Sequence, residues 1–331
     1  MKHSKKGMLA ELLDATCVTG LRRLFPLRGL TILAYHRVLD LGAEESYFAD
    51  PELVSASRAE FRRQMQYVGA HWNPLPLGEA IGRLIRGEDL PRRSVAITFD
   101  DGHIDNYTNA FPILKDVGVP ATIFLSTHYV GGTQAFWFDR VATLMCHAPA
   151  GSHRLSAPAC DLTLGDMRSR RSATEQVLAG LKKLADAQRV SALAELEERF
   201  AAHVPAAQES ERKALDWDQV REMSRQGITF GSHTVTHPIL STQTVEQIRF
   251  ELSESRRRIE AETGCDADLL AYPVGKPYAF DQRVVTIARE CGYRAAVAYI
   301  DGINRPGSCD MFALARTSVE RYFPHSMFVC R

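Results

Sequence analysis

Short runs of apolar residues, many of them β-branched or aromatic, recur along the chain, and amphipathic segments separate most of them. The runs predict strands over residues 30–35, 94–99, 121–126, 227–232, 269–274, 293–299 and 312–317. The longer segments predict helices over residues 57–71, 109–118, 245–264 and 282–292. Because strands that alternate with helices form parallel sheets, the pattern indicates an α/β fold with about seven strands.

The alternation is interrupted over residues 136–216. FWFDRVATLM opens this region, and helical patterns follow over residues 173–188 and 190–203. We expect a mostly helical insertion above the sheet rather than a separate domain. The main domain is then expected to run from residue 29 to residue 331, with the insertion inside it.

Polar and aromatic side chains gather at the carboxyl ends of the predicted strands. If the parallel sheet closes into a barrel, these ends meet at one rim, where the chemistry of such folds is found. The residues placed there are Tyr35 and His36, Asp100 and Asp101, His233, Tyr272 and Pro273, and Arg316. The predicted sheet therefore brings distant parts of the sequence to one candidate site.

Asp100 and Asp101 put two carboxylates directly after an apolar strand. Side chains alternate between the faces of a strand, but at its end both can turn toward one cavity. Two carboxylates in one cavity raise the proton affinity of one of them unless a cation is bound. An Asp pair alone is also common in turns and helix caps, so the metal site needs further ligands.

His233 and His237, in GSHTVTHP, supply such ligands. Residues four apart share one side of a helical turn, or they lie near each other in a loop. Two imidazoles and one carboxylate form a common site for a divalent ion with a position left for water. Two histidines at this spacing are often incidental, but together with the Asp pair they predict Zn²⁺, with Co²⁺ or Mn²⁺ as alternatives.

Composition limits the class of protein. The chain has 331 residues, 45% of them hydrophobic and 24% charged, and its formal net charge is +0. This balance is typical of globular proteins and gives no indication of a nucleic-acid partner. The seven cysteines are widely spaced and include no C-x-x-C pair, which argues against a disulfide framework and against a cysteine zinc site.

Residues 1–28 carry leucines interspersed with lysines and arginines, and Glu11 and Asp14 interrupt the apolar stretch that a signal peptide would need. The pattern predicts a basic amphipathic helix. Such a helix either packs on the main domain or makes peripheral contact with an anionic membrane surface. We therefore expect a location in the cytoplasm or at the inner face of the membrane.

Three motifs in order, TFDDG, GSHTVTHP and AYPVG, resemble those of the polysaccharide deacetylase family, also called the NodB-homology or carbohydrate esterase family 4 domain. ILAYHRV and FWFD are similar to a branch of that family found among bacterial exopolysaccharide and surface-glycan proteins. The resemblance covers residues 29–320 apart from the insertion. It implies a distorted (β/α)-type barrel, often of seven strands, in agreement with the strand pattern.

The resemblance also implies roles for the residues of the first two motifs. Asp101 matches the metal-binding aspartate, and His233 and His237 match the two histidine ligands. Asp100 matches the catalytic base, which takes a proton from water activated by the metal. The expected reaction is attack of that water on the carbonyl carbon of an N-acetyl group.

Residues of the third motif and its surroundings are expected to form the rest of the site. The backbone N–H of Val274 is the expected donor to the oxyanion, in a turn shaped by Pro273. Tyr272 and Trp217 are expected wall residues, although Trp217 is equally consistent with a core aromatic. His36 is expected either to touch the substrate or to make a supporting hydrogen bond.

The sequence departs from the family pattern at two places. Ala271 stands where many members have an arginine that orients the base, and we expect Arg316 to approach Asp100 instead. Arg316 also stands where the late motif has a histidine that protonates the leaving amine, and arginine is a poor proton donor. His36 and His325 are the alternative donors.

The main hypothesis is a metal-dependent hydrolase that removes N-acetyl groups from GlcNAc-type residues of a polysaccharide or lipid-linked glycan. The departures leave open a glycan-binding or assembly protein that keeps the metal but has lost turnover. An esterase that removes O-acetyl groups from carbohydrate also stays open, because both reactions pass through a tetrahedral oxyanion.

Overall fold

The computed structural model describes residues 29–42, 47, 50–206 and 214–321. The predicted N-terminal helix and His325 lie outside these residues, so the structure does not bear on them. Within the described part of the chain, no helix has the length and apolar character needed to cross a membrane.

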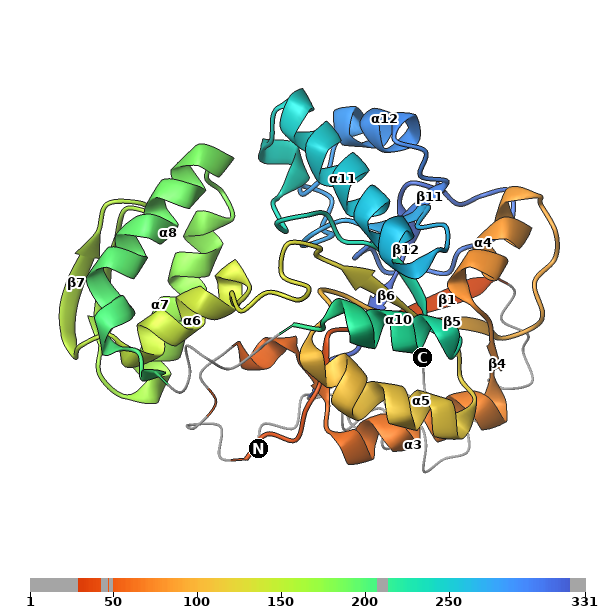
Figure 1. Cartoon of the computed structure of the whole chain (residues 1–331), viewed down its shortest axis with the longest axis horizontal. Coiled ribbons are helices and arrows are strands. Elements are labelled where there is room, and N and C mark those ends of the chain that lie inside the picture. The colour runs from red at the N-terminus through yellow and green to blue at the C-terminus, as the bar shows by residue number, and fades with distance from the viewer. Residues whose placement is uncertain (1–28, 43–46, 48–49, 207–213, 322–331) are drawn as a thin grey trace.

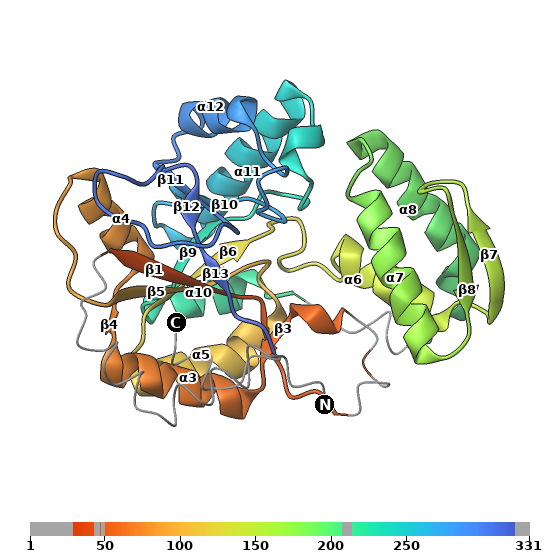
Figure 2. The ribbon, with the colours of Figure 1, turned by 180° about the vertical axis from the view of Figure 1, so that it is seen from behind.

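One parallel sheet curls into a nearly closed barrel at the centre of the molecule (Figures 1 and 2). Its path runs β12-β11-β10-β9-β6-β5-β1-β13. The strands are β1 (Leu30–Tyr35), β5 (Ser94–Phe99), β6 (Ala121–Leu125), β9 (Thr229–Ser232), β10 (Leu269–Ala271), β11 (Ala295–Ala298), β12 (Leu314–Ala315) and β13 (Thr317–Ser318). The predicted α/β barrel is confirmed, and each predicted run contributes to it.

The last chain segment closes the barrel because it pairs with strands on both sides. Before Arg316, β12 pairs with β11 in the register Val297↔Leu314, and after it β13 pairs with β1 in the register Leu33↔Thr317. The Arg316 amide donates to the Ala298 carbonyl at 3.1 Å. One segment, read as two short strands, therefore joins the two ends of the sheet path.

Burial on both faces explains the apolar runs that predicted these strands. Every residue of β5 is buried, as expected for a strand with side chains on the inside of a barrel and under helices on the outside. The covering helices (Figures 1 and 2) are α3 (Arg58–His71), α4 (Leu77–Ile85), α5 (Phe111–Val117), α10 (Trp217–Arg225), α11 (Val245–Thr263) and α12 (Gln282–Glu290). The prediction did not include α4, and a π-helical turn over Asn106–Ala110 precedes α5.

Local signals fix the ends of the longest helix, α11. The Thr244 hydroxyl accepts from the Gln247 amide, and the Gln247 side chain accepts from the Thr244 amide, which is a reciprocal capping box. At the other end Gly264 adopts φ 68°, a left-handed conformation in which glycine is favoured. These caps fix the ends of α11, which packs against β9, the strand that leads to the two histidines.

Residues 137–203 form a lobe at one side of the barrel (Figures 1 and 2). It contains α6 (Trp137–His147), an antiparallel hairpin of β7 (Gly151–Leu155) and β8 (Cys160–Leu164), α7 (Met167–Leu181), α8 (Asp186–Phe200) and a 3₁₀ turn over Ala201–His203. The lobe is mostly helical, as expected, but the hairpin was not predicted. The single helix predicted over residues 173–188 is wrong in its bounds, because α7 ends at Leu181 and α8 begins at Asp186. The lobe packs around one hydrophobic cluster, which Tyr129 and Ala214 from outside the lobe also join.

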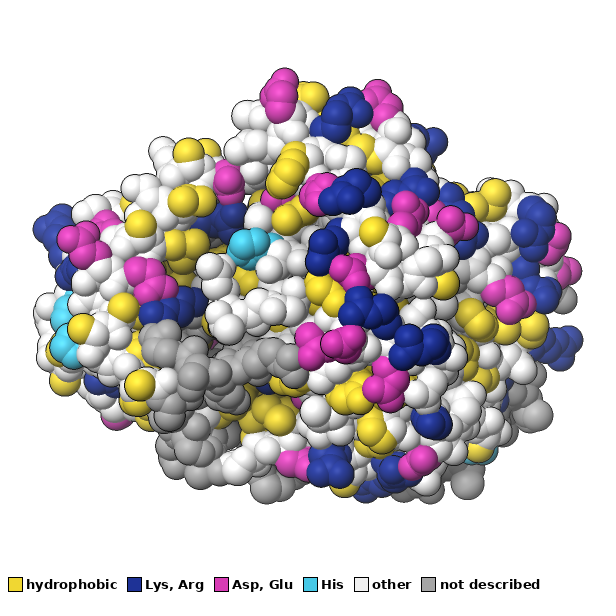
Figure 3. Space-filling model, viewed as in Figure 1, with side chains coloured by type: hydrophobic (Ala, Val, Ile, Leu, Met, Phe, Trp, Pro, Cys, Tyr) yellow, Lys and Arg dark blue, Asp and Glu magenta, His cyan; other side chains and the backbone are white. Residues whose placement is uncertain are grey.

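Short elements flank the barrel at its two ends. They are β2 (Arg37–Val38), which pairs with β3 (Val54–Ala56), β4 (Asn73–Pro74), which pairs with the start of β5, and 3₁₀ turns over Pro51–Leu53 and Leu240–Thr242. On the face seen in Figure 3, Lys and Arg side chains are interspersed with Asp and Glu. That face therefore carries no extended field of one sign.

Candidate active site

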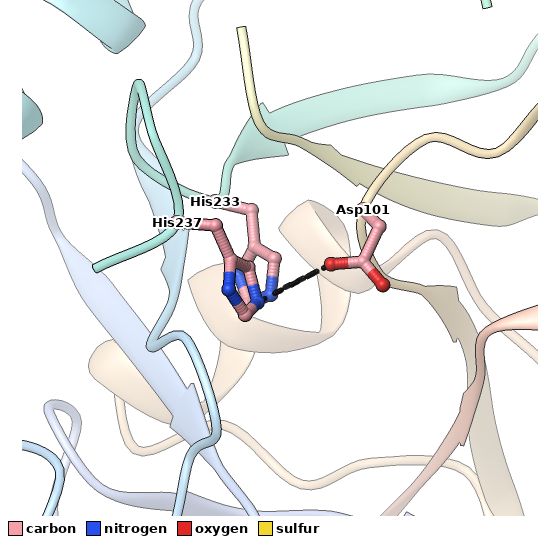
Figure 4. Close-up of side chains that lie close together, drawn as sticks. All are labelled: Asp101, His233 and His237. Atoms are coloured by element: carbon pink, nitrogen blue, oxygen red, sulfur yellow. Dashed lines mark ion pairs between the residues drawn. The ribbon is translucent and has the colours of Figure 1, made fainter. Parts of the chain in front are cut away.

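Asp101, His233 and His237 converge at the carboxyl ends of β5 and β9 (Figure 4). The Asp101 Oδ1 atom lies 3.5 Å from Nε2 of His233 and 3.4 Å from Nε2 of His237. One ligand atom from each residue lies within 4.8 Å of the others, and all three side chains are buried. The three predicted metal ligands therefore do meet in space, although they come from segments about 130 positions apart in the sequence.

The donor set fits a divalent metal ion. Asp101 Oδ1 is buried without a hydrogen-bond donor, which is costly for a carboxylate oxygen unless a cation satisfies it. His233 donates from Nδ1 to the Ala271 carbonyl at 2.7 Å, which leaves the lone pair of Nε2 facing the site. Burial lowers the pKa of His237 to about 3, so that its imidazole is neutral and able to ligate near neutral pH.

Backbone strain is concentrated at these residues. Among the described residues other than glycine, five adopt a positive φ, and four of them are Asp101 (72°), Thr234 (68°), His237 (58°) and Val274 (63°). Such conformations persist only where surrounding contacts hold them, and they cluster at functional sites. The loops after β5, β9 and β10 therefore keep strained backbone conformations that place particular groups at the site.

Glu251, on α11, holds the histidine loop in this strained shape. Its Oε2 accepts from the Val235 amide at 2.6 Å and from the Thr236 amide at 2.9 Å, and its Oε1 accepts from the Thr236 hydroxyl at 2.6 Å. Glu251 is buried, so these donors offset the cost of removing its charge from water. The sequence analysis did not single out this residue.

His103 contacts Asp101 at Oδ2, the carboxylate oxygen opposite the one that lies near His233 and His237. Its Nε2 lies 3.3 Å from Asp101 Oδ2, and both side chains are buried. Burial opposes ionisation of Asp101, but the contact with His103 and the nearby His237 outweigh it and lower the pKa of Asp101 well below its usual range. Asp101 is therefore held as a carboxylate, with Oδ2 in contact with His103 and Oδ1 free for a cation.

Asp100 is clamped by three donors. Arg316 donates from Nη1 to Oδ1 at 2.7 Å and from Nη2 to Oδ2 at 2.8 Å, and the Tyr299 hydroxyl donates to Oδ2 at 2.9 Å. Burial alone would raise the pKa of Asp100, but the Arg316 guanidinium outweighs burial and lowers it. The expected approach of Arg316 to Asp100 is thus present in the structure, and Tyr299 is a partner that the sequence analysis missed.

His36 lies beside Tyr299 at the end of β1. The two rings are nearly parallel, with centroids 5.9 Å apart, and His36 Nε2 lies 3.4 Å from the Tyr299 hydroxyl. The His36 carbonyl accepts from the Asn106 side chain at 2.8 Å, which fixes the backbone at this point. Burial lowers the pKa of His36 from its usual value.

A cavity of about 340 Å³ opens over these side chains. It is large enough for a small-molecule group, since ligand cavities have volumes of about 300–1,000 Å³. Its walls combine barrel residues with Trp137 and Phe138 from α6 and Leu178 from α7. The barrel contributes His36, Asp100, Asp101, His233, His237, Val274 and Tyr299.

The expected wall residues Trp217 and Tyr272 and the expected turn residue Pro273 are not among the described residues that line this cavity. Tyr272 is fully buried, because its ring stacks on Phe280 with centroids 4.0 Å apart and its hydroxyl donates to a backbone carbonyl. Trp217 packs under the Arg258 guanidinium, 5.2 Å from its ring centre. The aromatic wall of the cavity comes from the FWFD segment instead.

The chain is similar to known proteins over most of its length. Residues 87–296, more than half of the chain, match the family model described as Polysaccharide deacetylase. The putative polysaccharide deacetylase YxkH of Bacillus subtilis is 21% identical over 304 residues, which cover 90% of this chain and 74% of that protein. The poly-beta-1,6-N-acetyl-D-glucosamine N-deacetylase of Staphylococcus epidermidis is 44% identical over 80 residues, which cover only 24% of this chain and 27% of that protein.

Two solved structures share the fold. The Streptococcus pyogenes deacetylase PplD, in complex with acetate, superposes with a TM-score of 0.61 at 19% identity, covering 92% of this chain and 98% of that one. IcaB from Ammonifex degensii superposes with a TM-score of 0.58 at 19% identity, covering 92% of this chain and 99% of that one. At these identities the likeness concerns the fold.

Proposed function

Because the chain belongs to the polysaccharide deacetylase family, we propose that it hydrolyses the N-acetyl groups of N-acetylglucosamine residues in a β-1,6-linked glycan. The observation that carries the proposal is the meeting of Asp101, His233 and His237 beside a clamped second carboxylate, Asp100. The choice of glycan is supported by the local match to a poly-beta-1,6-N-acetyl-D-glucosamine N-deacetylase.

Asp101 and the two histidines would hold a divalent ion, which we propose to be Zn²⁺ because two imidazoles and one carboxylate suit it. When bound, such an ion polarises a carbonyl oxygen and lowers the pKa of water. His233 is held for this purpose by the Ala271 carbonyl, and Asp101 by His103.

Asp100 serves as the general base in this proposal. Its carboxylate is ionised, buried and oriented by Arg316 and Tyr299, and Asp100 lines the cavity. It takes a proton from the water that attacks the acetyl carbonyl carbon. A base held in position is more effective than a mobile one, because the entropy of orienting it is not lost during the reaction.

The backbone N–H of Val274 is the proposed donor to the oxyanion. Val274 lines the cavity with φ 63°, which turns its peptide away from the direction that the strand β10 would give it. A preorganised amide of this kind stabilises charge that develops in the transition state. Trp137 and Phe138 line the same cavity with apolar surface and limit its water content.

His36 is the proposed donor of the proton to the leaving amine. Its Nε2 and Asp100 Oδ2 both contact the Tyr299 hydroxyl, at 3.4 Å and 2.9 Å, so the base and the acid stand on either side of one hydroxyl. Because burial lowers the pKa of His36, its ring is neutral at rest, and it receives through the Tyr299 hydroxyl the proton that Asp100 took from the water. When the C–N bond breaks, the nitrogen keeps the electron pair and takes this proton, and acetate and a free amine leave.

Acetate release from a β-1,6-linked N-acetylglucosamine hexamer tests the proposal. We expect release by protein loaded with Zn²⁺, loss of release after chelation, and a fall of about a thousandfold or more in Asp100→Asn. Asp301→Asn, on the exposed surface, is the matched control and should keep the wild-type rate. Wild-type activity in Asp100→Asn would remove the assigned base, and release only from an O-acetylated sugar would favour an esterase.

A further inference from the structure

The first turn of α6 contacts the loop over residues 233–239, which carries the two histidines. This helix begins where the lobe meets the barrel (Figures 1 and 2). Its first residue, Trp137, donates from the indole N–H to the His237 carbonyl at 3.1 Å. The next residue, Phe138, packs edge to face with the His237 ring, with centroids 5.0 Å apart. The lobe therefore contacts both the backbone and the imidazole of one proposed metal ligand.

The His237 backbone depends on such contacts. Its φ of 58° lies in the left-handed region, which is unfavourable for a residue with a Cβ atom. The His237 amide donates to the Thr234 hydroxyl at 3.1 Å, and the Trp137 indole holds its carbonyl. Strained conformations persist only where surrounding contacts hold them. Loss of the indole donor should therefore let the peptide after His237 rotate and move the imidazole away from its ligating position.

Arg189, on α8, holds Trp137 by the face of its ring. The guanidinium carbon lies 5.0 Å from the ring centre of Trp137. Arg189 is buried, and its Nη2 donates to Asp186 Oδ1 at 2.5 Å, so its charge is paired while it lies over the indole. A cation over the face of a tryptophan is attracted to the ring, and more strongly where water is excluded. Arg189 therefore restrains the indole from turning away from the His237 carbonyl.

An ion pair fixes α6 against α8 close to these contacts. Arg140, three residues after Trp137, donates from Nε to Glu197 Oε1 and from Nη2 to Glu197 Oε2, each at 2.6 Å. A two-point contact of this kind sets orientation as well as distance. The position of α8 therefore determines where α6 presents Trp137 to the barrel.

We propose that Arg189 is a positioning residue of the metal site, acting through Trp137 on the backbone of His237. The lobe then has a part in metal binding, because its helix α8 keeps a loop of the barrel in the ligating shape. This support is separate from that of Glu251, which holds the same loop from α11. The inference rests on the proposed function, since it takes His237 as a metal ligand.

Substitutions that remove one contact at a time test this chain of contacts. Trp137→Phe removes the indole N–H and keeps an aromatic ring. Arg189→Met removes the cation and keeps an unbranched side chain in the same space, so it should fold. Arg189→Lys restores a cation without the planar group. The matched control is Arg199→Met on the same helix, because the Arg199 guanidinium lies over another ring of the lobe, 5.2 Å from the centre of Phe200.

The first measurement is the dissociation constant of Co²⁺, together with its visible absorption spectrum, which depends on ligand number and geometry. We expect Trp137→Phe and Arg189→Met to raise this constant about tenfold and to change the spectrum. Arg189→Lys should recover part of the affinity, and Arg199→Met should match wild type. The double variant of Trp137→Phe and Arg189→Met should bind no more weakly than Trp137→Phe alone, because both act through one hydrogen bond.

The second measurement is hydrogen exchange over residues 233–239 in metal-free protein. We expect faster exchange in Trp137→Phe and Arg189→Met than in wild type and Arg199→Met. Wild-type affinity and exchange in Arg189→Met, or additive losses in the double variant, would overturn the proposal. If wild type takes up no Co²⁺, the proposed function fails instead. Exchange then decides the hold of Arg189 on the loop: faster exchange in Arg189→Met supports it, and unchanged exchange refutes it.

Discussion

Arg316 and Asp100 form a fully buried two-point ion pair, with contacts of 2.7 Å and 2.8 Å. Asp100 follows β5, and Arg316 is the single residue between β12 and β13, where the barrel closes. The strand pairing that completes the barrel therefore also sets the position of the arginine that orients the proposed base. Fold and chemistry are coupled at this one pair.

Replacing Arg316 should lower both the stability of the protein and its catalytic rate. Arg316→Ala leaves the Asp100 charge buried with only Tyr299 as a donor, and we expect a loss of about 3–5 kcal/mol in the free energy of unfolding. Arg316→Lys keeps the charge but not the two-point contact. We expect it to fold and to lose about 10- to 100-fold in kcat, measured as acetate release.

The exposed Arg305→Ala is the control for a change of net charge. It should leave both stability and kcat unchanged. An Arg316→Lys protein with the wild-type rate would show that the two-point contact has no part in orienting the base.

Tyr299→Phe separates the hydroxyl from the ring. The ring stays under the Arg316 guanidinium, 4.4 Å from its centre, while the donation to Asp100 and the contact with His36 are lost. We expect a small change in stability, about 1 kcal/mol, since Arg316 still satisfies Asp100. Steady-state kinetics should give a kcat lowered by about tenfold with KM nearly unchanged; a change confined to KM would contradict the assigned role.

Gly275→Ala should displace the Tyr299 side chain while leaving its chemical groups unchanged. A Cβ at Gly275 would lie 2.6 Å from Tyr299 Cδ2, and the glycine has φ 60°. Gly264→Ala is the matched control, because Gly264 has φ 68° and open space around the added methyl group. Both variants should lose about 1 kcal/mol from backbone strain, and thermal unfolding should show a larger loss in Gly275→Ala, together with a lowered kcat. Equal behaviour of the two variants would mean that Tyr299 can move freely.

Glu251→Gln should weaken metal binding. The substitution replaces an acceptor of three hydrogen bonds with a group that cannot accept them all, so the loop that carries His237 loses its anchor. Supporting residues of this kind change metal affinity by about 10- to 100-fold. Competition with a chromophoric chelator measures this affinity, with Glu254→Gln on the same helix as the control.

The sequence predicted the features of the fold and site that depend on strand periodicity and on the types of metal-ligand residues. The seven strands and the meeting of Asp101, His233 and His237 followed from apolar runs and from the rule that strand ends share one rim. The same rule would have selected Tyr299, which ends the run over residues 293–299. It was missed because a tyrosine at the end of an apolar run also fits an ordinary core position.

Other parts of the site had no local signal. Glu251 lies on a polar-rich helix far from the motifs, and only the fold turns its carboxylate toward the histidine loop. Trp137 was part of a quoted motif, but its place beside His237, where its indole N–H donates to the His237 carbonyl at 3.1 Å, depends on how the lobe packs on the barrel. Trp217 and Tyr272 were assigned to the wall because aromatic type does not distinguish a cavity wall from a core.

Metal-dependent release of acetate tests the account most directly. Protein stripped of metal and then titrated with Zn²⁺ is assayed with the β-1,6-linked N-acetylglucosamine hexamer, in wild type and in His233→Ala. We predict that the wild-type rate rises in proportion to bound Zn²⁺ and levels off at one ion per chain, and that His233→Ala neither retains the ion nor releases acetate. Full loading with Zn²⁺ and no acetate from any N-acetylated oligomer would contradict the account.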